Sequence, residues 1–219
     1  MSDQSERTRT TGHVLAVSVG RPQVVDRRGV EATTAIFKRN VDGAVRAAGV
    51  NLDGDDQADR DAHGGYDKAV YAYAEADRLW WEDETGREIE RGGFGENLTV
   101  DGMDVTNAVV GERWRVGTVL VEVSEPRVPC WKLNHRMGDE RFIQRFNAAG
   151  RPGTYLRIME EGVLRAGDDV TITAVPNHGL TIGDIATMYR RRAGVERLLD
   201  IQQVSEPWKA WARRTIDRA

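Results

Sequence analysis

Cysteine is the residue type that this sequence has least of: Cys130 is the single one among 219 residues. One cysteine excludes an internal disulfide, a zinc site with two or more thiolates and a four-thiolate iron–sulfur cluster. No run of about 18 apolar residues is present, so we expect no membrane span. Residues 1–12 lack an apolar stretch, which argues against a secretory signal and predicts a disordered tail. These absences together favour a reducing, cytoplasmic setting.

The formal net charge is a modest −4, but it is unevenly distributed. From Thr181 onward eight Lys and Arg residues stand against five acids, so this segment carries +3 and the remainder −7. Because the acids are interleaved with the basic residues, we expect no nucleic-acid partner. The asymmetry instead marks the C-terminal segment as a separate unit.

Short alternating segments and glycine-rich turns dominate the chain up to Pro176. They predict strands over 13–19, 35–38, 96–100, 113–116, 119–123, 155–159 and 169–175, and helices over 74–84 and 141–148. The acidic stretch 51–61 is expected to be a loop. Many short strands with few helices favour a mainly β fold with α elements (α+β class), built as a β-barrel core with peripheral helices.

The pattern changes after Pro176 to a helical one. Three short helices are expected over 182–191, 195–202 and 207–216. Trp208 and Trp211 are three residues apart, so they share one helix face and are expected to pack inward. The sequence therefore predicts a β-barrel domain over 13–178 followed by a small three-helix domain over 179–219.

The lone cysteine lies in an unusual setting, Pro126-Arg-Val-Pro-Cys-Trp-Lys132. The two prolines fix φ and restrict the residues before them, so this segment is expected to be a rigid turn. Arg127 and Lys132 place cationic side chains near the sulfur, as is typical of metal-binding or nucleophilic cysteines. A small buried hydrophobe is the alternative that the residues alone leave open. No protease signature accompanies the histidines, so a cysteine protease is disfavoured.

Two glycine-rich segments can present backbone N–H groups to an anion. The first runs from His63 to Lys68 (HGGYDK), and the second from Gly92 to Asn97 (GGFGEN). A tight turn with a solvated lysine and a β-bulge are the structural alternatives. The aspartates of 53–59 do not form an EF-hand, because the required glycine and glutamate are missing. With the cysteine, these segments predict a pocket for an anionic ligand that binds sulfur.

Several motifs in the same order resemble the MOSC domain family, named for the C-terminal domain of molybdenum cofactor sulfurase, and in particular its YiiM-like branch. The resemblance runs from His13 to the C-terminus, and only the N-terminal tail is additional. It rests on the segments TAIFK (34–38), GDDQAD (54–59), HGGYDKAV (63–70), FGENL (94–98), PRVPC (126–130), RPGTY (151–155) and GVLRAGD (162–168). The three-helix tail also resembles the C-terminal α domain of that branch.

The resemblance implies a MOSC-type β-barrel that binds molybdenum cofactor, a molybdenum ion held by the dithiolene of a phosphorylated pyranopterin. The family's metal-binding cysteine corresponds to Cys130, and a thiolate is a suitable soft ligand for such a metal. Cofactor-binding roles are implied for four further residues, His63, Lys68, Asn97 and Arg127. Two others, Arg151 and Tyr155, can line the mouth of the site or have structural roles.

In function, the resemblance implies an oxidoreductase that reduces N-hydroxylated compounds, such as N-hydroxylated purine bases. Because one cysteine cannot hold an iron–sulfur cluster, electrons are expected from an external donor protein. Two alternatives remain: a sulfur carrier with a persulfide on Cys130, and a non-enzymatic module that binds a cofactor or docks a partner. Pyridoxal phosphate on Lys68 is a further possibility, disfavoured because a Schiff-base lysine should be desolvated.

Overall fold

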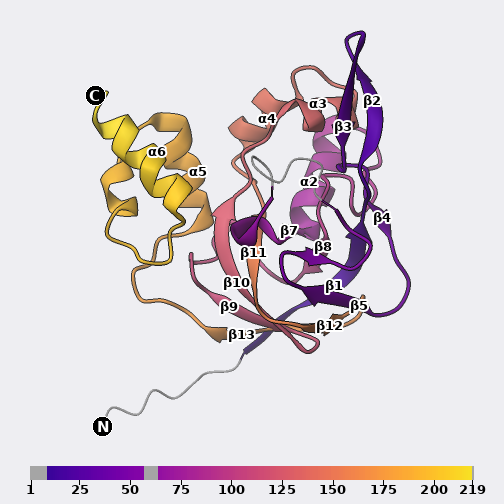
Figure 1. The fold of residues 1–219 in the computed structure, drawn as a ribbon, viewed down its shortest axis with the longest axis horizontal. Helices are drawn as coiled ribbons and strands as arrows, with labels where there is room; N and C mark the ends of the chain where they lie inside the picture. Colours follow the sequence, from indigo (N-terminus) through magenta and orange to yellow (C-terminus); the bar gives the residue numbers. More distant parts are fainter. Residues whose placement is uncertain (1–8, 57–63, 219) are drawn as a thin grey trace.

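The computed structural model describes residues 9–56 and 64–218 of the chain, and Figure 1 shows a β-barrel with helices on its rim. The strands are β1 (Arg9–Val19), β2 (Gln23–Arg27), β3 (Val30–Thr34), β4 (Arg39–Asn40), β5 (Val45–Ala48), β6 (Asn51–Leu52), β7 (Val70–Ala74), β8 (Leu98–Asp101), β9 (Arg113–Val116), β10 (Val119–Pro126), β11 (Thr154–Glu160), β12 (Gly162–Leu164) and β13 (Asp169–Ala174). The helices are η1 (Tyr66–Lys68), α2 (Glu75–Thr85), α3 (Trp131–Met137), α4 (Phe142–Ala149), α5 (Ile182–Arg191), η2 (Val195–Leu198) and α6 (Glu206–Ile216).

Seven strands close the barrel in the order β13-β9-β10-β11-β7-β8-β1, because β1 pairs back onto β13. Neighbouring strands are antiparallel except β7 and β8, which run parallel with α2 between them in the chain. The short strand β4 adds to β1 outside the closed ring. Closure leaves most of these strands without a free edge and confirms the predicted barrel with peripheral helices.

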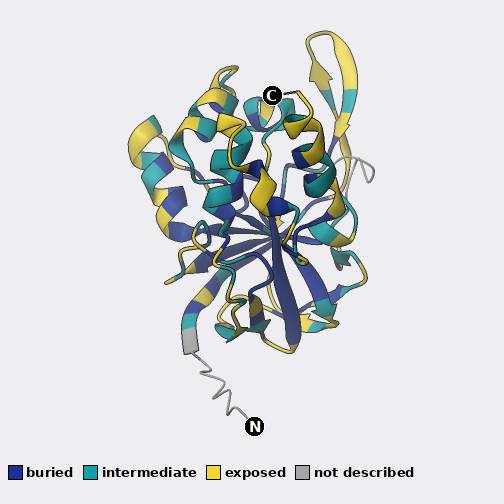
Figure 2. Cartoon of the chain, turned by 90° about the vertical axis from the view of Figure 1, so that its left-hand side faces the viewer, coloured by how far each residue is buried: buried dark blue, intermediate teal, exposed yellow. Residues whose placement is uncertain are grey.

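The barrel interior is filled by small and branched apolar side chains. β10 is buried along its whole length, and Trp114 of β9 is 1% exposed within this core. A second cluster, rich in aromatic rings, packs between the barrel and helices α2, α3 and α4. Its central ring is Phe94, which stacks on Tyr73 with ring centroids 4.5 Å apart. The dark-blue barrel strands in Figure 2 show how completely this centre is shielded from solvent.

The C-terminal elements α5, η2 and α6 pack beside the barrel (Figure 1). α5 begins at Thr181, which forms a capping box with Asp184. Trp208 and Ala212 of α6 lie in the same continuous apolar cluster as the barrel core, so the inward packing of Trp208 is confirmed. The middle element is a four-residue 3-10 helix and is shorter than the helix expected over 195–202.

Several local expectations are corrected by the structure. Residues 35–38 form no strand but an extended connection between β3 and β4. Residues 9–12, expected in the tail, belong to β1 and pair with β13, whereas 1–8 lie outside the described residues. The acidic stretch begins with the short strand β6, and the helix α3 directly after Cys130 was not predicted.

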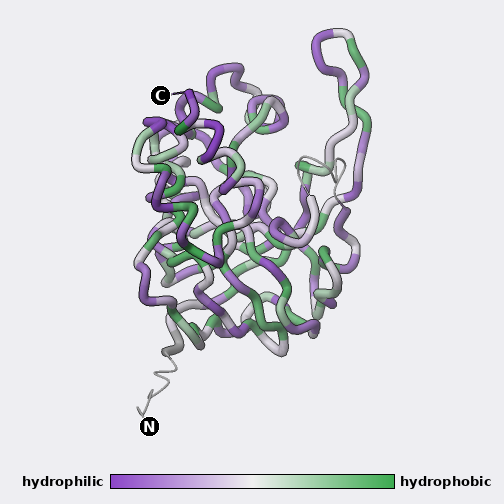
Figure 3. The backbone as a smooth tube through the Cα atoms, turned by 60° about the vertical axis from the view of Figure 1, so that its left-hand side comes forward, coloured by the Kyte–Doolittle hydropathy of each residue, from purple (hydrophilic) through white to green (hydrophobic). Residues whose placement is uncertain are grey.

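The hairpin of β2 and β3 was also not predicted, and Figure 3 shows it projecting from the rest of the chain with polar and apolar residues mixed along it. It has no apolar face to bury, since Val24 and Val30 are 63% and 66% exposed. This is why its pattern gave no clear signal in the sequence. Within the described part of the chain, no helix is both long and apolar enough to cross a bilayer.

Candidate functional site

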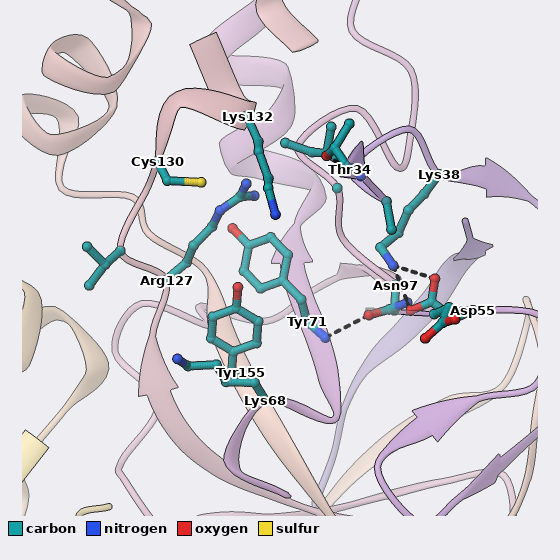
Figure 4. A pocket seen from close by; sticks show the side chains of 15 residues that line it. Thr34, Lys38, Asp55, Lys68, Tyr71, Asn97, Arg127, Cys130, Lys132 and Tyr155 are labelled. Carbon is teal, nitrogen blue, oxygen red and sulfur yellow. Dashed lines mark hydrogen bonds and ion pairs between the residues drawn. The ribbon is translucent and has the colours of Figure 1, made fainter. Parts of the chain in front are cut away.

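A pocket opens on the rim of the barrel, where the chain leaves β3, β6 and β10 (Figure 4). It encloses about 660 Å³ of space, part of which is open to solvent. Its lining residues are Thr34, Ala35, Ile36, Lys38, Asp55, Asp56, Lys68, Tyr71, Gly95, Asn97, Arg127, Val128, Cys130, Lys132 and Tyr155.

Cys130 lies on one wall of the pocket with its thiol partly exposed and free. Its extended backbone, at φ −128° and ψ 178°, ends the segment that leaves β10 and directly precedes α3. Figure 4 shows its side chain directed toward the guanidinium of Arg127. The small-buried-hydrophobe alternative therefore does not describe this residue, because its sulfur faces a polar pocket.

Arg127 is held in place from two sides. Its guanidinium donates a hydrogen bond to the Phe94 carbonyl and lies 5.0 Å from the ring centroid of Tyr71. Burial opposes its charge, but Tyr71, Tyr155 and Cys130 around it raise the pKa of Arg127 overall. A fixed cation therefore lies beside the sulfur, and its geometry depends on the glycine-rich segment that carries Phe94.

Two tyrosine rings form a second wall. Tyr71 and Tyr155 lie with ring centroids 5.1 Å apart, on the adjacent strands β7 and β11. The Tyr71 hydroxyl donates to the Pro152 carbonyl at 2.7 Å. Burial raises the pKa of both phenols, so both remain neutral hydroxyl groups at physiological pH. Flat, neutral rings of this kind suit a flat heterocycle as a neighbour.

The floor contains a buried ion pair. Lys38 Nζ lies 2.5 and 2.7 Å from the two carboxylate oxygens of Asp55, and the two side chains are only 8% and 3% exposed. Asp55 also accepts hydrogen bonds from the Gly20 amide at 2.7 Å and from Asn97 Nδ2 at 2.9 Å. Burial lowers the pKa of Lys38, although the charge of Asp55 opposes that change.

Asn97 connects this ion pair to the barrel. Its side-chain oxygen accepts the Tyr71 amide at 3.0 Å, and Nδ2 donates to the Ser18 carbonyl at 3.1 Å as well as to Asp55. Both ends of the amide are thus engaged with the protein itself. Asn97 lines the pocket, but its side-chain amide already makes hydrogen bonds to protein groups, and these bonds hold the pocket floor in position.

Two further lysines complete the lining. Lys68 Nζ lies 3.5 Å from Glu125 Oε1, with a quarter of its side chain exposed. Burial raises the pKa of Glu125, and the nearby Lys68 works against that rise. Lys132 comes from the first turn of α3 and points toward Tyr71 (Figure 4).

The balance of charge in the pocket is positive. Four cationic side chains and two aspartates line it, and one aspartate is neutralised by Lys38. A partly enclosed cavity with this excess of cations attracts anions, because the low-dielectric walls concentrate the field. The site thus combines a soft sulfur, fixed cations and aromatic walls, which suits an anionic ligand with a flat ring and an atom that binds sulfur.

The structure brings together most of the residues predicted from the sequence. Cys130, Lys68, Asn97, Arg127 and Tyr155 all line this one pocket. His63, also predicted to bind the cofactor, lies outside the described residues.

Arg151 does not line this pocket. Its guanidinium instead bonds to Asp77 and lies 4.6 Å from a ring of Trp80. Of the two functions considered for it, the structure supports the structural one.

Among the lining residues that were missed as site residues, Lys38, Asp55 and Tyr71 matter most for the geometry. Lys38 and Asp55 lie within the 34–38 and 54–59 motifs, so their charged side chains could have identified them as candidate site residues from the sequence. Tyr71 had none, because it sits inside an apolar strand run where an aromatic residue is ordinarily part of the core.

The family model of the MOSC domain matches residues 59–171. YflK, an uncharacterised protein of Bacillus subtilis, is 33% identical over 209 residues, which cover 94% of this chain and 95% of YflK. YiiM of Escherichia coli is 33% identical over 159 residues, covering 71% of this chain and 66% of YiiM. A Gibberella moniliformis protein named "Reductase" is 33% identical over 185 residues, covering 83% of this chain but 33% of that much longer protein.

Solved structures show the same relationship. The crystal structure of YiiM from Geobacillus stearothermophilus is similar with a TM-score of 0.78 and 26% identity, covering 94% of this chain and 99% of that one. Escherichia coli YiiM, at a TM-score of 0.72 and 23% identity over 95% and 94% of the two chains, shares the fold. The family model spans just over half of this chain and YflK matches nearly all of it, so the chain belongs to the MOSC domain family, in the branch of YflK and YiiM.

Proposed function

We propose that this protein binds molybdenum cofactor and acts as a reductase of N-hydroxylated compounds, with electrons supplied by an external donor protein. The observation that carries the proposal is the placement of the Cys130 thiol in a cationic, tyrosine-walled pocket beside Arg127. Membership of the MOSC family supports the cofactor, and the relative named "Reductase" supports the class of reaction.

The residues present fit the cofactor in three respects. The Cys130 sulfur is a soft donor suited to molybdenum. Lys68, Lys132 and Arg127 supply cationic donors for the phosphate and for the polar edge of the pterin, of the type that recognises anions. The rings of Tyr71 and Tyr155 provide a flat wall for a heterocycle. When bound, the cofactor supplies two-electron redox chemistry that no side chain can perform.

The overall reaction is R–NH–OH + 2 H⁺ + 2 e⁻ → R–NH₂ + H₂O. The N–O bond breaks, the nitrogen keeps one new hydrogen and the oxygen leaves as water. The chain itself holds the ligand through Cys130 and Arg127 and keeps its aromatic wall neutral. Lys132, on the rim, can donate a proton to the departing oxygen.

The electrons must come from another protein domain. The Gibberella "Reductase" matches this chain over only a third of its own length, so it carries much additional sequence. We propose that a separate donor protein supplies the electrons, because one cysteine cannot hold an iron–sulfur cluster.

A sulfur carrier is the second candidate, because the partly exposed Cys130 can hold a persulfide without any metal. The binding of pyridoxal phosphate to Lys68 has no comparable support. Lys68 is a quarter exposed and lies beside Glu125, whereas the desolvated lysine of the pocket is Lys38, which is ion-paired with Asp55.

The test is purification from a host that makes molybdenum cofactor, with molybdenum and pterin measured per chain. We expect about one molybdenum per wild-type chain, its loss in Cys130→Ala, and its retention in the control Val163→Ala on the exposed face of β12. The loaded protein should reduce an N-hydroxylated purine with reduced methyl viologen. Cyanide-labile sulfur on Cys130 without molybdenum would favour the sulfur carrier. If the purified protein has neither molybdenum nor cyanide-labile sulfur, both candidate functions are contradicted.

A further inference from the structure

The C-terminal helices carry exposed cations that the proposed reaction does not use. We call Arg190, Arg191, Arg192 and Arg214 the basic patch; all four are exposed. They come from the end of α5, the residue after it, and the last turn of α6. This patch lies in the segment whose charge is +3, whereas the remainder of the chain carries −7.

The patch is held together by stacking. The guanidinium of Arg192 lies 5.0 Å from the ring centroid of Tyr189 and 5.2 Å from that of Trp211. Arg214 follows Trp211 by three residues, which places it on the same face of α6. Cations of α5 and α6 therefore share one surface, and the aromatic rings beneath limit the freedom of Arg192.

Arg192 is also unusual in its backbone. It ends α5 at φ 55°, in the left-handed region where glycine is favoured and other residues cost about 1 kcal/mol. The backbone of Arg192 therefore adopts a conformation that arginine disfavours. Strained positions of this kind are found disproportionately at functional surfaces.

The charges of the patch are little neutralised by the protein itself. Among residues 9–56 and 64–218, Arg191 and Arg214 have no ion-pair partner. Arg190 donates to the carbonyls of Asn147 and Ala148, which are uncharged acceptors. Glu206, an exposed acid in the first turn of the helix that carries Arg214, pairs instead with Lys209 and Arg213. The patch therefore presents a net positive field to solvent.

The patch adjoins the functional pocket. Arg190 lines a small hollow together with Arg127 and Val128, and the latter two residues also line the pocket of Cys130. One segment of chain, 126–128, thus separates the two cavities. A protein bound on the basic patch would be seated next to the site where electrons are consumed.

We propose that the basic patch is the docking surface for an acidic redox protein that delivers the electrons for the reduction. The inference rests on the proposed function and adds the place and the charge of the partner. Each N–O bond cleaved consumes two electrons, so two molecules of a one-electron carrier are oxidised per turnover. Charge complementarity of this kind mainly raises the association rate and orients the encounter.

The test uses the cofactor-loaded full chain with an acidic [2Fe–2S] ferredoxin, kept reduced by NADPH and its reductase. The variant is Arg191→Glu with Arg214→Glu. The matched control, Arg46→Glu with Arg165→Glu, makes the same charge change at exposed sites in β5 and directly after β12, two strands that lie away from α5 and α6 in Figure 1. We expect the KM for ferredoxin to rise about tenfold or more in the patch variant and little in the control. Turnover with methyl viologen should be equal in all three proteins.

A second readout does not depend on turnover. Titration calorimetry of oxidised ferredoxin with each protein should show binding that weakens with salt and is lost in the patch variant. Equal binding by patch variant and control, or no binding by the wild type, would overturn the docking surface. If viologen fails to support turnover while ferredoxin binds to the patch, the proposed reaction fails and the docking surface stands.

Discussion

The buried ion pair of Lys38 and Asp55 allows a quantitative test of how the pocket floor is built. The perturbation is Lys38→Met, which keeps most of the volume but removes the ammonium 2.5 and 2.7 Å from the carboxylate. Asp55, 3% exposed, would keep two donors, the Gly20 amide and Asn97 Nδ2, but no countercharge. Removal of one partner from a buried pair costs about 3–5 kcal/mol, and the two remaining donors favour the lower end.

The assay is thermal and urea unfolding of the cofactor-free protein. A loss of about 3 kcal/mol corresponds to a fall in Tm of roughly 6–12 °C for a chain of this size. The control is Arg46→Met, which breaks the exposed pair with Glu161 (60% and 54% exposed) and should cost less than about 1 kcal/mol. The double variant Lys38→Met with Asp55→Asn should lose less than the sum of the single changes, because it removes both charges. A Lys38→Met loss no larger than that of the control would refute the argument that the pair is desolvated.

Three further predictions concern the surroundings of the site. Burial alone would raise the pKa of Glu75, but hydrogen bonds from Arg78 and Arg91 lower it to about 2. The contribution of the Glu75 carboxylate to the free energy of unfolding is therefore complete above about pH 5 and is lost as the pH falls toward 2. Glu75→Gln should therefore destabilise by about 3 kcal/mol at pH 7 and not at pH 2, and equal pH profiles by urea unfolding would contradict this. Gly153 and Gly138 both have positive φ, but a Cβ on Gly153 would lie 2.7 Å from the Ala72 carbonyl oxygen, whereas a Cβ on Gly138 would face open space. Gly153→Ala should therefore lower the Tm several times more than Gly138→Ala does. Lysine cannot reproduce the planar, forked guanidinium of Arg127, so in Arg127→Lys the pterin retained on purification should fall at least ~10-fold. Full retention of the pterin would exclude a cofactor-binding role for Arg127.

Much of the barrel was predictable because several of its strands alternate in sequence and end at glycine-containing turns. The hairpin of β9 and β10 turns at Gly117-Thr118 as expected, and α5 has the predicted bounds Ile182–Arg191. Failures occurred where local pattern and tertiary environment differ. Residues 35–38 look apolar enough for a strand, but they cross the pocket between β3 and β4 and have no strand beside them to pair with. The helix α3 is short and follows two prolines, so its period was hidden.

The candidate site shows the same division. Cys130, Arg127 and Lys68 could be identified because unusual residue types stood in rigid or glycine-rich segments. Asn97 was identified too, but its actual hydrogen bonds to Ser18, Asp55 and the Tyr71 amide join segments far apart in the chain. No local pattern can report such bonds, since each partner is chosen by strand register.

The sequence by itself determined the fold class, the family and the solitary thiol, because periodicity, glycine placement and a single cysteine are local or countable properties. Only the tertiary structure decided that Lys38 and Asp55 form the pocket floor, that Arg151 belongs to a different contact, and that α5 and α6 bring four arginines onto one surface. The reason is closure of the barrel: strand order β13-β9-β10-β11-β7-β8-β1 places residues 38, 55, 71, 97 and 127 around one opening. Proximity of this kind depends on long-range pairing, which the spacing of residues along the chain does not encode.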